Sequence, residues 1–344
     1  MRKLIQLAMA LVVIATAFTL SGTVHAQSTP PATQAATSGA LSITALAAST
    51  PDLSTLAAAL KAIGFDNYFD KNGPYTVLAP TNAAFAAALK ALNLTADKLL
   101  ADKQTLTRIL LYHVLPGSLQ AAAFSKNSGS KVATLLWGGT LTITADAKSV
   151  KFNKATVTTA DVEASNGIVH VIDQVLVPGD ETVAPFADFI TFKPGSKDLL
   201  TIAGGADNLK TLVAAVGAAP SVGSYLSTKG ASFTVFAPND AAFTAAFTAL
   251  KTTPDAFLKD TATLTTVLAL HVIPWPYTSK VLAGYDGVLT GTVLTDTFLR
   301  YKVAGGKISI GGGINIVTAD VLASNGIVHI IDDVLIPPSL TAAK

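Results

Sequence analysis

The chain has 344 residues, of which 50% are hydrophobic and 13% are charged, and it contains no cysteine. The lack of cysteine excludes disulfides, thiolate metal sites and a cysteine nucleophile, so the fold depends on its hydrophobic cores. The 24 Lys and Arg residues are scattered among 22 Asp and Glu residues, and without a clustered basic stripe a nucleic acid is not expected as the partner.

The N-terminus predicts export. Arg2 and Lys3 precede the apolar run Leu4 to Leu20, and Val24-His25-Ala26 ends in a small residue, as a signal-peptidase site requires. We therefore expect residues 1–26 to be a cleaved signal peptide. The alternative is an uncleaved anchor, because the apolar run approaches the length of a membrane span.

Cleavage would leave a nearly neutral mature chain with 22 basic and 22 acidic residues. That balance offers no polybasic segment to anionic lipids. We expect no stable membrane insertion after signal removal, and a location that is secreted or extracellular, meaning the periplasm or cell surface if the source is a bacterium. Residues 27–40 form a Ser-, Thr-, Pro- and Ala-rich spacer that is too poor in large apolar residues to pack.

The first half of the mature chain reads mainly as helix. From Ser42 to Ile63 apolar residues recur at helical spacing, with a helix start at Pro51-Asp52. Tyr75 to Leu78 is expected to be a short strand, after which Thr81 or Asn82 caps a helix that runs through Leu89. A further helix is expected over Leu99 to Leu115.

Strands are expected to follow these helices. The predicted strands are Val132–Leu136, Thr140–Ala145, Ala155–Asp161 and Ile168–Val177. Asn166-Gly167 and Asn325-Gly326 are predicted to be hairpin turns, because both residue types adopt positive φ readily. Helices followed by strands indicate an α+β fold.

The second half of the chain repeats the first. Residues 159–178 (TADVEASNGIVHVIDQVLVP) and 318–337 (TADVLASNGIVHIIDDVLIP) are identical at 16 of 20 positions. Two shorter segments also recur: YTVLAPTNAAF at 75–85 as FTVFAPNDAAF at 233–243, and LTRILLYHVLP at 106–116 as LTTVLALHVIP at 264–274. The offset of 158 to 159 residues is the size of an independent domain, so the chain is expected to hold two copies of one domain.

These three segments, in this order, resemble the fasciclin domain. The resemblance implies a pair of tandem α+β domains, each a wedge-shaped β-sandwich with an N-terminal set of helices. It places domain 1 at 41–178 and domain 2 at 197–338, with a linker at 179–196 and a C-terminal tail at 339–344. Each copy carries the full order of segments, so each is expected to fold as a unit.

The resemblance also marks a set of structural signature residues in the two copies. They are Pro80, Asn82, Phe85, Asn166, Gly167 and His170 in copy one, and Pro238, Asn239, Phe243, His271, Asn325, Gly326 and His329 in copy two.

The histidines are the obvious candidates for catalysis, since His113/His271 and His170/His329 recur in register. A triad of Ser165, His170 and Asp173 is not expected, because side chains alternate along a strand and Asp173 would point away from the imidazole. Asp161, across the hairpin, stays open as a partner. A buried structural histidine is the preferred interpretation.

No metal site, cofactor site or nucleotide site is expected. The two histidines of each copy are 57 or 58 residues apart, unlike the short spacing of zinc sites. Asp70-Lys71-Asn72-Gly73 has only a fragment of the ligands of a calcium loop and reads as a turn. The glycines at 305–306 and 311–313 are followed by a strand rather than a helix, so they read as hairpin turns. Asn93-Leu94-Thr95 is a single glycosylation sequon and decides nothing.

Tyr112-His113 is the candidate binding element. In fasciclin adhesion proteins a Tyr-His pair with apolar flanks has been suggested as a receptor contact, and the resemblance carries that suggestion to these two residues. A core role is the alternative that their apolar neighbours favour. Copy two has Leu270-His271 instead, and neither copy contains Arg-Gly-Asp.

We therefore expect a secreted, non-enzymatic adhesion or interaction module. Its partner would be a cell-surface or matrix protein or glycan that the sequence does not name. Two linked weak sites gain affinity through effective concentration, which agrees with the duplication. The alternative is an extracellular small-ligand carrier, or an enzyme with a pocket built from dispersed residues.

Overall fold

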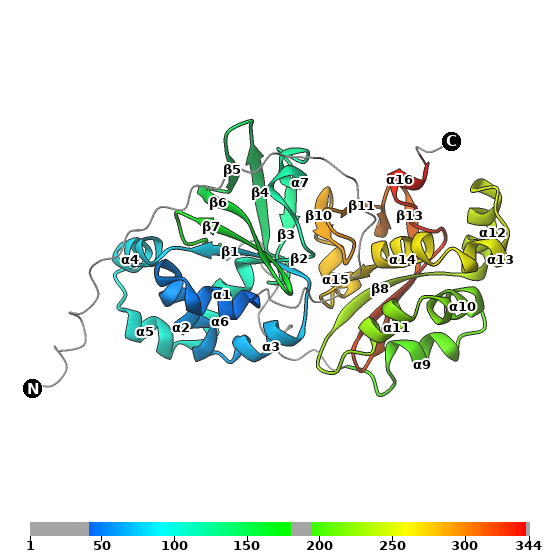
Figure 1. Ribbon diagram of the computed structural model, residues 1–344, viewed down its shortest axis with the longest axis horizontal. Helices are drawn as coiled ribbons and strands as arrows, with labels where there is room; N and C mark the ends of the chain where they lie inside the picture. The colour runs from blue at the N-terminus through cyan, green and yellow to red at the C-terminus, as the bar shows by residue number, and fades with distance from the viewer. Residues whose placement is uncertain (1–40, 180–193, 342–344) are drawn as a thin grey trace, which may run out of the picture. The chain divides into compact units, whose positions relative to one another are not determined.

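The computed structural model describes residues 41–179 and 194–341 (Figure 1). The predicted signal peptide, the spacer and most of the predicted linker lie outside these residues. The elements of repeat one are α1 (Ile43–Ser49), the 3-10 helix η1 (Pro51–Leu53), α2 (Ser54–Ala62), α3 (Phe65–Lys71), β1 (Tyr75–Pro80), α4 (Asn82–Ala91), α5 (Ala96–Ala101), α6 (Lys103–Tyr112), β2 (Val114–Pro116), α7 (Ala121–Ser125), β3 (Lys131–Ala133), β4 (Thr140–Ala145), β5 (Val150–Phe152), β6 (Ala155–Ala164) and β7 (Gly167–Ile172).

Except that it has no counterpart of η1 and ends with the additional helix α16, repeat two has, among the described residues, the same order of elements. They are α9 (Leu199–Gly204), α10 (Lys210–Ala218), α11 (Pro220–Leu226), β8 (Phe233–Pro238), α12 (Asp240–Ala249), α13 (Pro254–Lys259), α14 (Thr261–Leu270), β9 (Val272–Ile273), α15 (Ser279–Leu282), β10 (Val288–Gly291), β11 (Phe298–Ala304), β12 (Lys307–Ile310), β13 (Ile314–Ala323), β14 (Gly326–Ile331) and α16 (Pro338–Thr341). The fold is α+β, with two tandem domains, as the sequence predicts.

Several predicted elements differ from those observed. The strand Thr140–Ala145 is confirmed, but the single helix over Leu99 to Leu115 is wrong. Asp102 interrupts it at φ −84 and ψ 78, and its carboxylate caps the next helix by accepting from the Thr105 amide at 3.1 Å. After Tyr112 the chain turns into strand β2.

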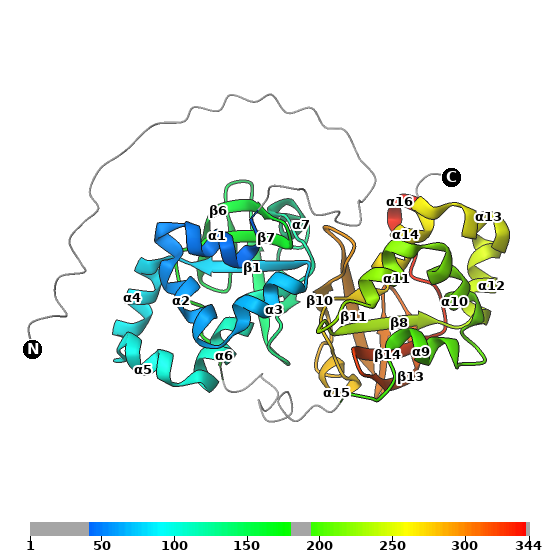
Figure 2. The same ribbon diagram turned by 60° about the horizontal axis from the view of Figure 1, so that its bottom comes forward.

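The strands of each repeat run in one continuous order, and the helices lie beside them. Within the described residues the order is β2-β1-β7-β6-β5-β4-β3 in repeat one and β10-β11-β12-β13-β14-β8-β9 in repeat two. Strands β1 and β7 are parallel, as are β8 and β14, while β6 pairs antiparallel with β7. Helices α9, α10 and α11 lie beside β8 in both views (Figures 1 and 2).

In each repeat, backbone hydrogen bonds connect the two ends of the strand order. In repeat one the Leu135 amide donates to the carbonyl of Val114 at 2.8 Å, which joins the chain after β3 to strand β2. In repeat two the Val293 amide donates to the carbonyl of Val272 at 2.9 Å, after β10. The two ends of each strand order are therefore tied together around the apolar core of the repeat.

The Asn-Gly hairpins form, but for a different reason from the predicted one. Ala164 pairs with Gly167, so the two loop residues are Ser165 and Asn166. Only the glycine has positive φ, at 149°. A Cβ atom at Gly167 would lie 1.8 Å from the Tyr75 carbonyl oxygen, and one at Gly326 would lie 2.2 Å from that of Phe233. Glycine is needed here because the neighbouring parallel strand approaches too closely for a side chain.

The two repeats share a core and fall in one compact unit. Strand β3 pairs in parallel with β10, with Val132 opposite Leu289. The Tyr277 hydroxyl donates to the carbonyl of Thr134 at 2.8 Å, and Nε1 of Trp137 donates to the carbonyl of Pro276 at 2.8 Å. Both hydrogen bonds are buried, and both side chains belong to the apolar cluster that the repeats share. Contacts between loosely tethered domains are usually more polar.

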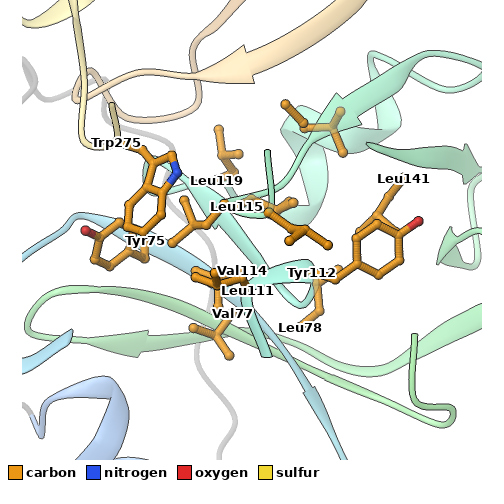
Figure 3. Packing of buried hydrophobic residues seen from close by; sticks show 14 of the residues in the cluster. Tyr75, Val77, Leu78, Leu111, Tyr112, Val114, Leu115, Leu119, Leu141 and Trp275 are labelled. Atoms are coloured by element: carbon orange, nitrogen blue, oxygen red, sulfur yellow. The ribbon is translucent and has the colours of Figure 1, made fainter. Parts of the chain in front are cut away.

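The backbones of the two repeats also approach each other closely. A Cβ atom at Gly291 would lie 2.0 Å from the carbonyl oxygen of Pro116 in repeat one. Trp275 belongs to the same apolar cluster as Tyr75, and Figure 3 shows the two rings near each other. Whether one repeat folds alone stays a prediction, but each contributes side chains to the core of the other.

Among the described residues, no single helix combines the length and hydropathy of a membrane span; one pair, Ile43–Ser49 with Pro51–Ala62, does so only when joined across a bend of 110°.

Candidate functional site

The Tyr-His pair of repeat one lies at the C-terminal end of α6, with both side chains in the core. Tyr112 is 6% exposed and His113 is 1% exposed. The Tyr112 hydroxyl donates to the carbonyl of Thr140 at 2.8 Å and accepts from Nδ2 of Asn153 at 3.3 Å. Figure 3 shows its ring beside Leu141. A receptor contact through these side chains would require them to leave the core.

His113 connects the end of α6 to the segment that follows β7, the last strand of repeat one. Its Nδ1–H donates to the carbonyl of Ile109 at 2.7 Å, and its Nε2 accepts from the amide of Leu176 at 2.8 Å. The same contacts recur in repeat two, where His271 has Val267 and Leu335 as partners at 2.7 and 3.0 Å. Burial lowers the pKa of both histidines to about 4, so both rings are neutral at pH 7.

His170 does not form a catalytic pair with Asp161. The backbone amide of Asp161 donates to Nδ1 of His170 at 3.2 Å, and Nε2–H donates to the carbonyl of Leu119 at 2.9 Å. Nδ1 is thus an acceptor, with no proton to share with the Asp161 carboxylate 4.0 Å away. That carboxylate accepts from the Ala121 amide at 2.8 Å and holds the start of α7.

Repeat two copies this arrangement. Nδ1 of His329 accepts from the Asp320 amide at 3.3 Å, and Nε2–H donates to the carbonyl of Tyr277 at 2.9 Å. The Asp320 carboxylate accepts from the amide and hydroxyl of Ser279 at the start of α15. Asp161 and Asp320 have positive φ, 58° and 57°, within the irregular pairing of β6 and β13. Each histidine therefore connects a bulged strand, β6 or β13, to the residues that immediately precede the short helix α7 or α15.

Asn166 and Asn325 connect the hairpin to the first helices. Oδ1 of Asn166 accepts from the Ile43 amide at 2.9 Å, and its Nδ2 donates to the carbonyl of Phe69 at the end of α3. Asn325 makes the equivalent bonds, to the Leu199 amide at 2.9 Å and the Leu226 carbonyl at 2.7 Å. These pairs also establish the correspondence between the helices of the two repeats.

The residues after β1 and β8 position the helix that follows. Thr81 is the N-cap of α4 and accepts from the Ala84 amide at 3.1 Å, while Asn239 caps α12 through the Ala242 amide at 2.8 Å. Asn82 and its counterpart Asp240 instead accept from the amides of Thr55 and Thr211, both at helix starts, at 2.9 and 2.7 Å. Pro80 and Pro238 end the preceding strands, and Phe85 and Phe243 are buried.

A pair of buried threonines was missed by the sequence analysis. The Thr76 hydroxyl donates to the carbonyl of Gly117 at 2.7 Å and accepts from the Leu119 amide at 2.9 Å. Thr234 does the same with Trp275 and Tyr277, at 2.7 and 2.8 Å. The available signal was a polar residue recurring at the same position of an otherwise apolar strand.

The described residues contain no group of three or more His, Asp or Glu side chains close enough to hold a metal ion. The segment Asp70-Lys71-Asn72-Gly73, which the sequence predicts to be a turn rather than a calcium loop, begins in the last two residues of α3, and Nδ2 of Asn72 donates to the carbonyl of Tyr68 at 2.7 Å. Asp70 accepts from the Thr44 hydroxyl. The Asn72 amide group thus bonds within α3, and the Asp70 carboxylate bonds to α1.

The carboxylates that line the larger concavities form hydrogen bonds with neighbouring groups of the fold. A concavity of about 700 Å³ in repeat two is lined by Leu270, Asp332 and Asp333 among others. Asp332 accepts from the Asn315 amide at 2.8 Å, and Asp333 from the Val334 amide at 2.7 Å. A second, of about 620 Å³, is lined mostly by Ser, Thr and apolar residues, with Asp70 as its carboxylate.

Comparison with known proteins identifies both repeats. The family model described as Fasciclin domain matches residues 51–178 and 207–337. Protein sll1483 of Synechocystis sp. is 46% identical over 145 residues, which cover 42% of this chain and 78% of that protein. Cell surface glycolipoprotein MPB83 of Mycobacterium bovis is 38% identical over 136 residues, covering 38% of this chain and 58% of that protein.

Among solved structures, a FAS1 domain pair from the insect cell adhesion molecule Fasciclin I aligns with 82% of this chain and 93% of its own, at 20% identity and a TM-score of 0.39.

Proposed function

The chain belongs to the fasciclin domain family, and from that membership we propose that it is an extracellular, non-enzymatic interaction module. Its two domains bind components of a cell surface or matrix. The partner is a protein or glycan, and the outer faces of the repeats make the contact. A relative that is named a cell surface glycolipoprotein supports the location, as does the export signal that the N-terminal residues predict.

The observation that supports this proposal most strongly is that the polar side chains that recur in both repeats form hydrogen bonds within the protein itself. Each duplicated histidine has both ring nitrogens bonded to backbone groups. The duplicated asparagines hold helix ends, and Asp161 and Asp320 hold the starts of α7 and α15. A catalytic pocket needs converging ionisable groups with free positions for substrate; these groups are committed to the fold.

A tandem arrangement suits binding of repeated or extended partners. Two weak sites in one chain gain affinity because the second contact is intramolecular. The shared core and the pairing of β3 with β10 limit the freedom of one repeat relative to the other, which lowers the entropy lost when both sites bind together.

The test is retention of surface components by the mature protein, residues 27–344, immobilised at known density. Saturable retention that disappears when the protein is heat-unfolded is the expected result. Tyr112→Phe and His170→Gln, which alter only buried groups, should retain as much as wild type when folded. Absence of saturable retention on cells, matrix proteins and glycans would rule the proposal out.

A further inference from the structure

Repeat two contains an apolar cavity beneath its first helices. The cavity has a volume of about 520 Å³ and lies between α9, α10 and α11 and the strands β8 and β14. Its walls include Leu199, Leu212, Val216, Val222 and Leu226. A volume of this size, with a mostly apolar lining and a few polar groups, is typical of a small-molecule site.

Repeat one provides an internal reference for this cavity. Asn166 binds the carbonyl of Phe69 where Asn325 binds that of Leu226, so these two residues correspond. One helical turn earlier, Phe65 corresponds to Val222. The Phe65 and Phe69 rings pack edge to face at 5.6 Å and join the core of repeat one. The cavity in repeat two opens where two phenylalanines are replaced by smaller aliphatic residues.

Charge is also removed at the matching positions. The corresponding helices of repeat one border a smaller depression of about 360 Å³, which is lined by Lys61, Asp66 and Asp70 among others. Their counterparts in repeat two are Gly217, Gly223 and Ser227, and all three line the larger cavity. Replacement of charged residues by glycine and serine leaves a lining that, among the residues the structure describes, has no Asp, Glu, Lys or Arg side chain.

The ionisable side chain that the described lining does contain, His271, leaves the cavity uncharged at neutral pH. His271 lines the cavity, but both of its ring nitrogens bind backbone groups and the ring is neutral at pH 7. Hydroxyl groups come from Ser224 and Ser227, which are exposed. A charged ligand would lose its hydration in this cavity without forming an ion pair, which is unfavourable. Transfer of a hydrocarbon from water into the cavity is favourable, because it removes apolar surface from water.

We propose that repeat two binds an uncharged, largely hydrocarbon small molecule in this cavity. Binding covers apolar surface that repeat one covers with its own phenylalanines, and the serines at the opening accommodate a hydroxyl or similar polar end. The site is distinct from the outer faces used for surface partners, so one activity can be lost without the other.

The test uses the uncharged fluorescent dye Nile red and the mature two-repeat protein. We expect one dye bound per chain, displaced by decan-1-ol and at least tenfold less effectively by decanoate. The variant Val222→Phe/Leu226→Phe restores the side chains of repeat one and should weaken dye binding by at least tenfold while the melting temperature stays equal or rises. Val317→Phe, the same substitution as at Val222 but at a residue that is 54% exposed, is the control and should bind as wild type.

A second variant covers the case in which the double variant does not fold. Gly223→Asp introduces the charge of repeat one, and a Cβ atom at Gly223 meets only Val216, at 3.6 Å or more, so the fold should tolerate it. Dye binding should fall at least tenfold at pH 7. Absence of stoichiometric dye binding to wild type, binding unaffected by these variants, or preference for decanoate would overturn the proposal.

Discussion

Tyr112 and Leu270 occupy matching positions at the ends of α6 and α14, and they differ by a ring and a hydroxyl. Both are buried, so the difference lies inside the two domains. In repeat one the hydroxyl satisfies the carbonyl of Thr140 and the amide group of Asn153. The Tyr-His pair that resembles a receptor contact is thus part of the packing of repeat one.

The first prediction is that Tyr112→Phe destabilises the protein by about 1 kcal/mol, since it strands the Thr140 carbonyl. Tyr112→Leu should cost about 2–3 kcal/mol, because it also removes ring packing, although Leu fills the position in repeat two. Retention of surface components should be unchanged in both. Urea unfolding measured beside the retention assay checks this, and lost retention at unchanged stability would make Tyr112 a binding residue.

The second prediction concerns pH. His113 and His271 have pKa values of about 4 in the folded protein because they are buried, against about 6.5 when unfolded. A folded pKa below the unfolded one means that stability is complete above pH 6.5 and is lost as the pH falls toward 4. Each histidine should therefore cost about 2–3 kcal/mol of unfolding free energy between pH 7 and pH 4.5.

Urea unfolding at a series of pH values measures this loss. The double variant His113→Gln/His271→Gln keeps a donor and an acceptor at each position and should show a flatter dependence over this range. An NMR titration of the imidazoles gives an independent reading. Imidazole pKa values near 6.5 in the folded protein would contradict the prediction.

At the scale of elements, the hairpin glycines are determined by the neighbouring strand rather than by the turn. Gly167→Ala or Gly326→Ala would place a methyl group against a carbonyl oxygen of β1 or β8. The third prediction is a loss of about 4 kcal/mol or a failure to fold, through displacement of a buried parallel strand. Gly204→Ala, in helix α9 with nothing within 4 Å of the added carbon, is the control and should be neutral or stabilising. Thermal melting of the three variants distinguishes these outcomes.

The parts of the fold that could be predicted are those set by local pattern. The alternation in Thr140–Ala145 is visible within six residues, and the strand is found there. The break at Asp102 was missed, because an N-cap inside a long apolar-periodic segment resembles an exposed helical residue. The asparagine bridges from Asn166 to the Ile43 amide and the Phe69 carbonyl span 123 and 97 residues, and no local pattern reports contacts of that separation.

The same limit applied to the candidate site. The sequence indicated that His170 was structural from its apolar neighbours, and the structure places it 1% exposed with two backbone partners. The partner carbonyl of Leu119 lies 51 residues away. The apolar cavity could be recognised only after the asparagine bridges aligned Phe69 with Leu226, since the helices around it differ in sequence between the repeats.

At the scale of the whole molecule, the shared core predicts coupled unfolding. Tyr301→Phe removes a hydroxyl that bonds to Thr290 within repeat two at 2.9 Å, and should cost about 1 kcal/mol. The fourth prediction is that calorimetry shows a single transition for wild type, and that this variant moves the whole transition to lower temperature. Two transitions of which only one moves would show that the repeats unfold independently.

We propose that this fasciclin protein binds its partners through the outer faces of its folded repeats and not through its buried polar groups. The most direct measurement is saturable retention of cell-surface and matrix components on immobilised residues 27–344, compared among wild type, His170→Gln and Tyr112→Phe. We expect equal retention by all three folded proteins and none after heat unfolding. Retention that vanishes in a folded His170→Gln or Tyr112→Phe variant, or no saturable retention by wild type, would contradict it.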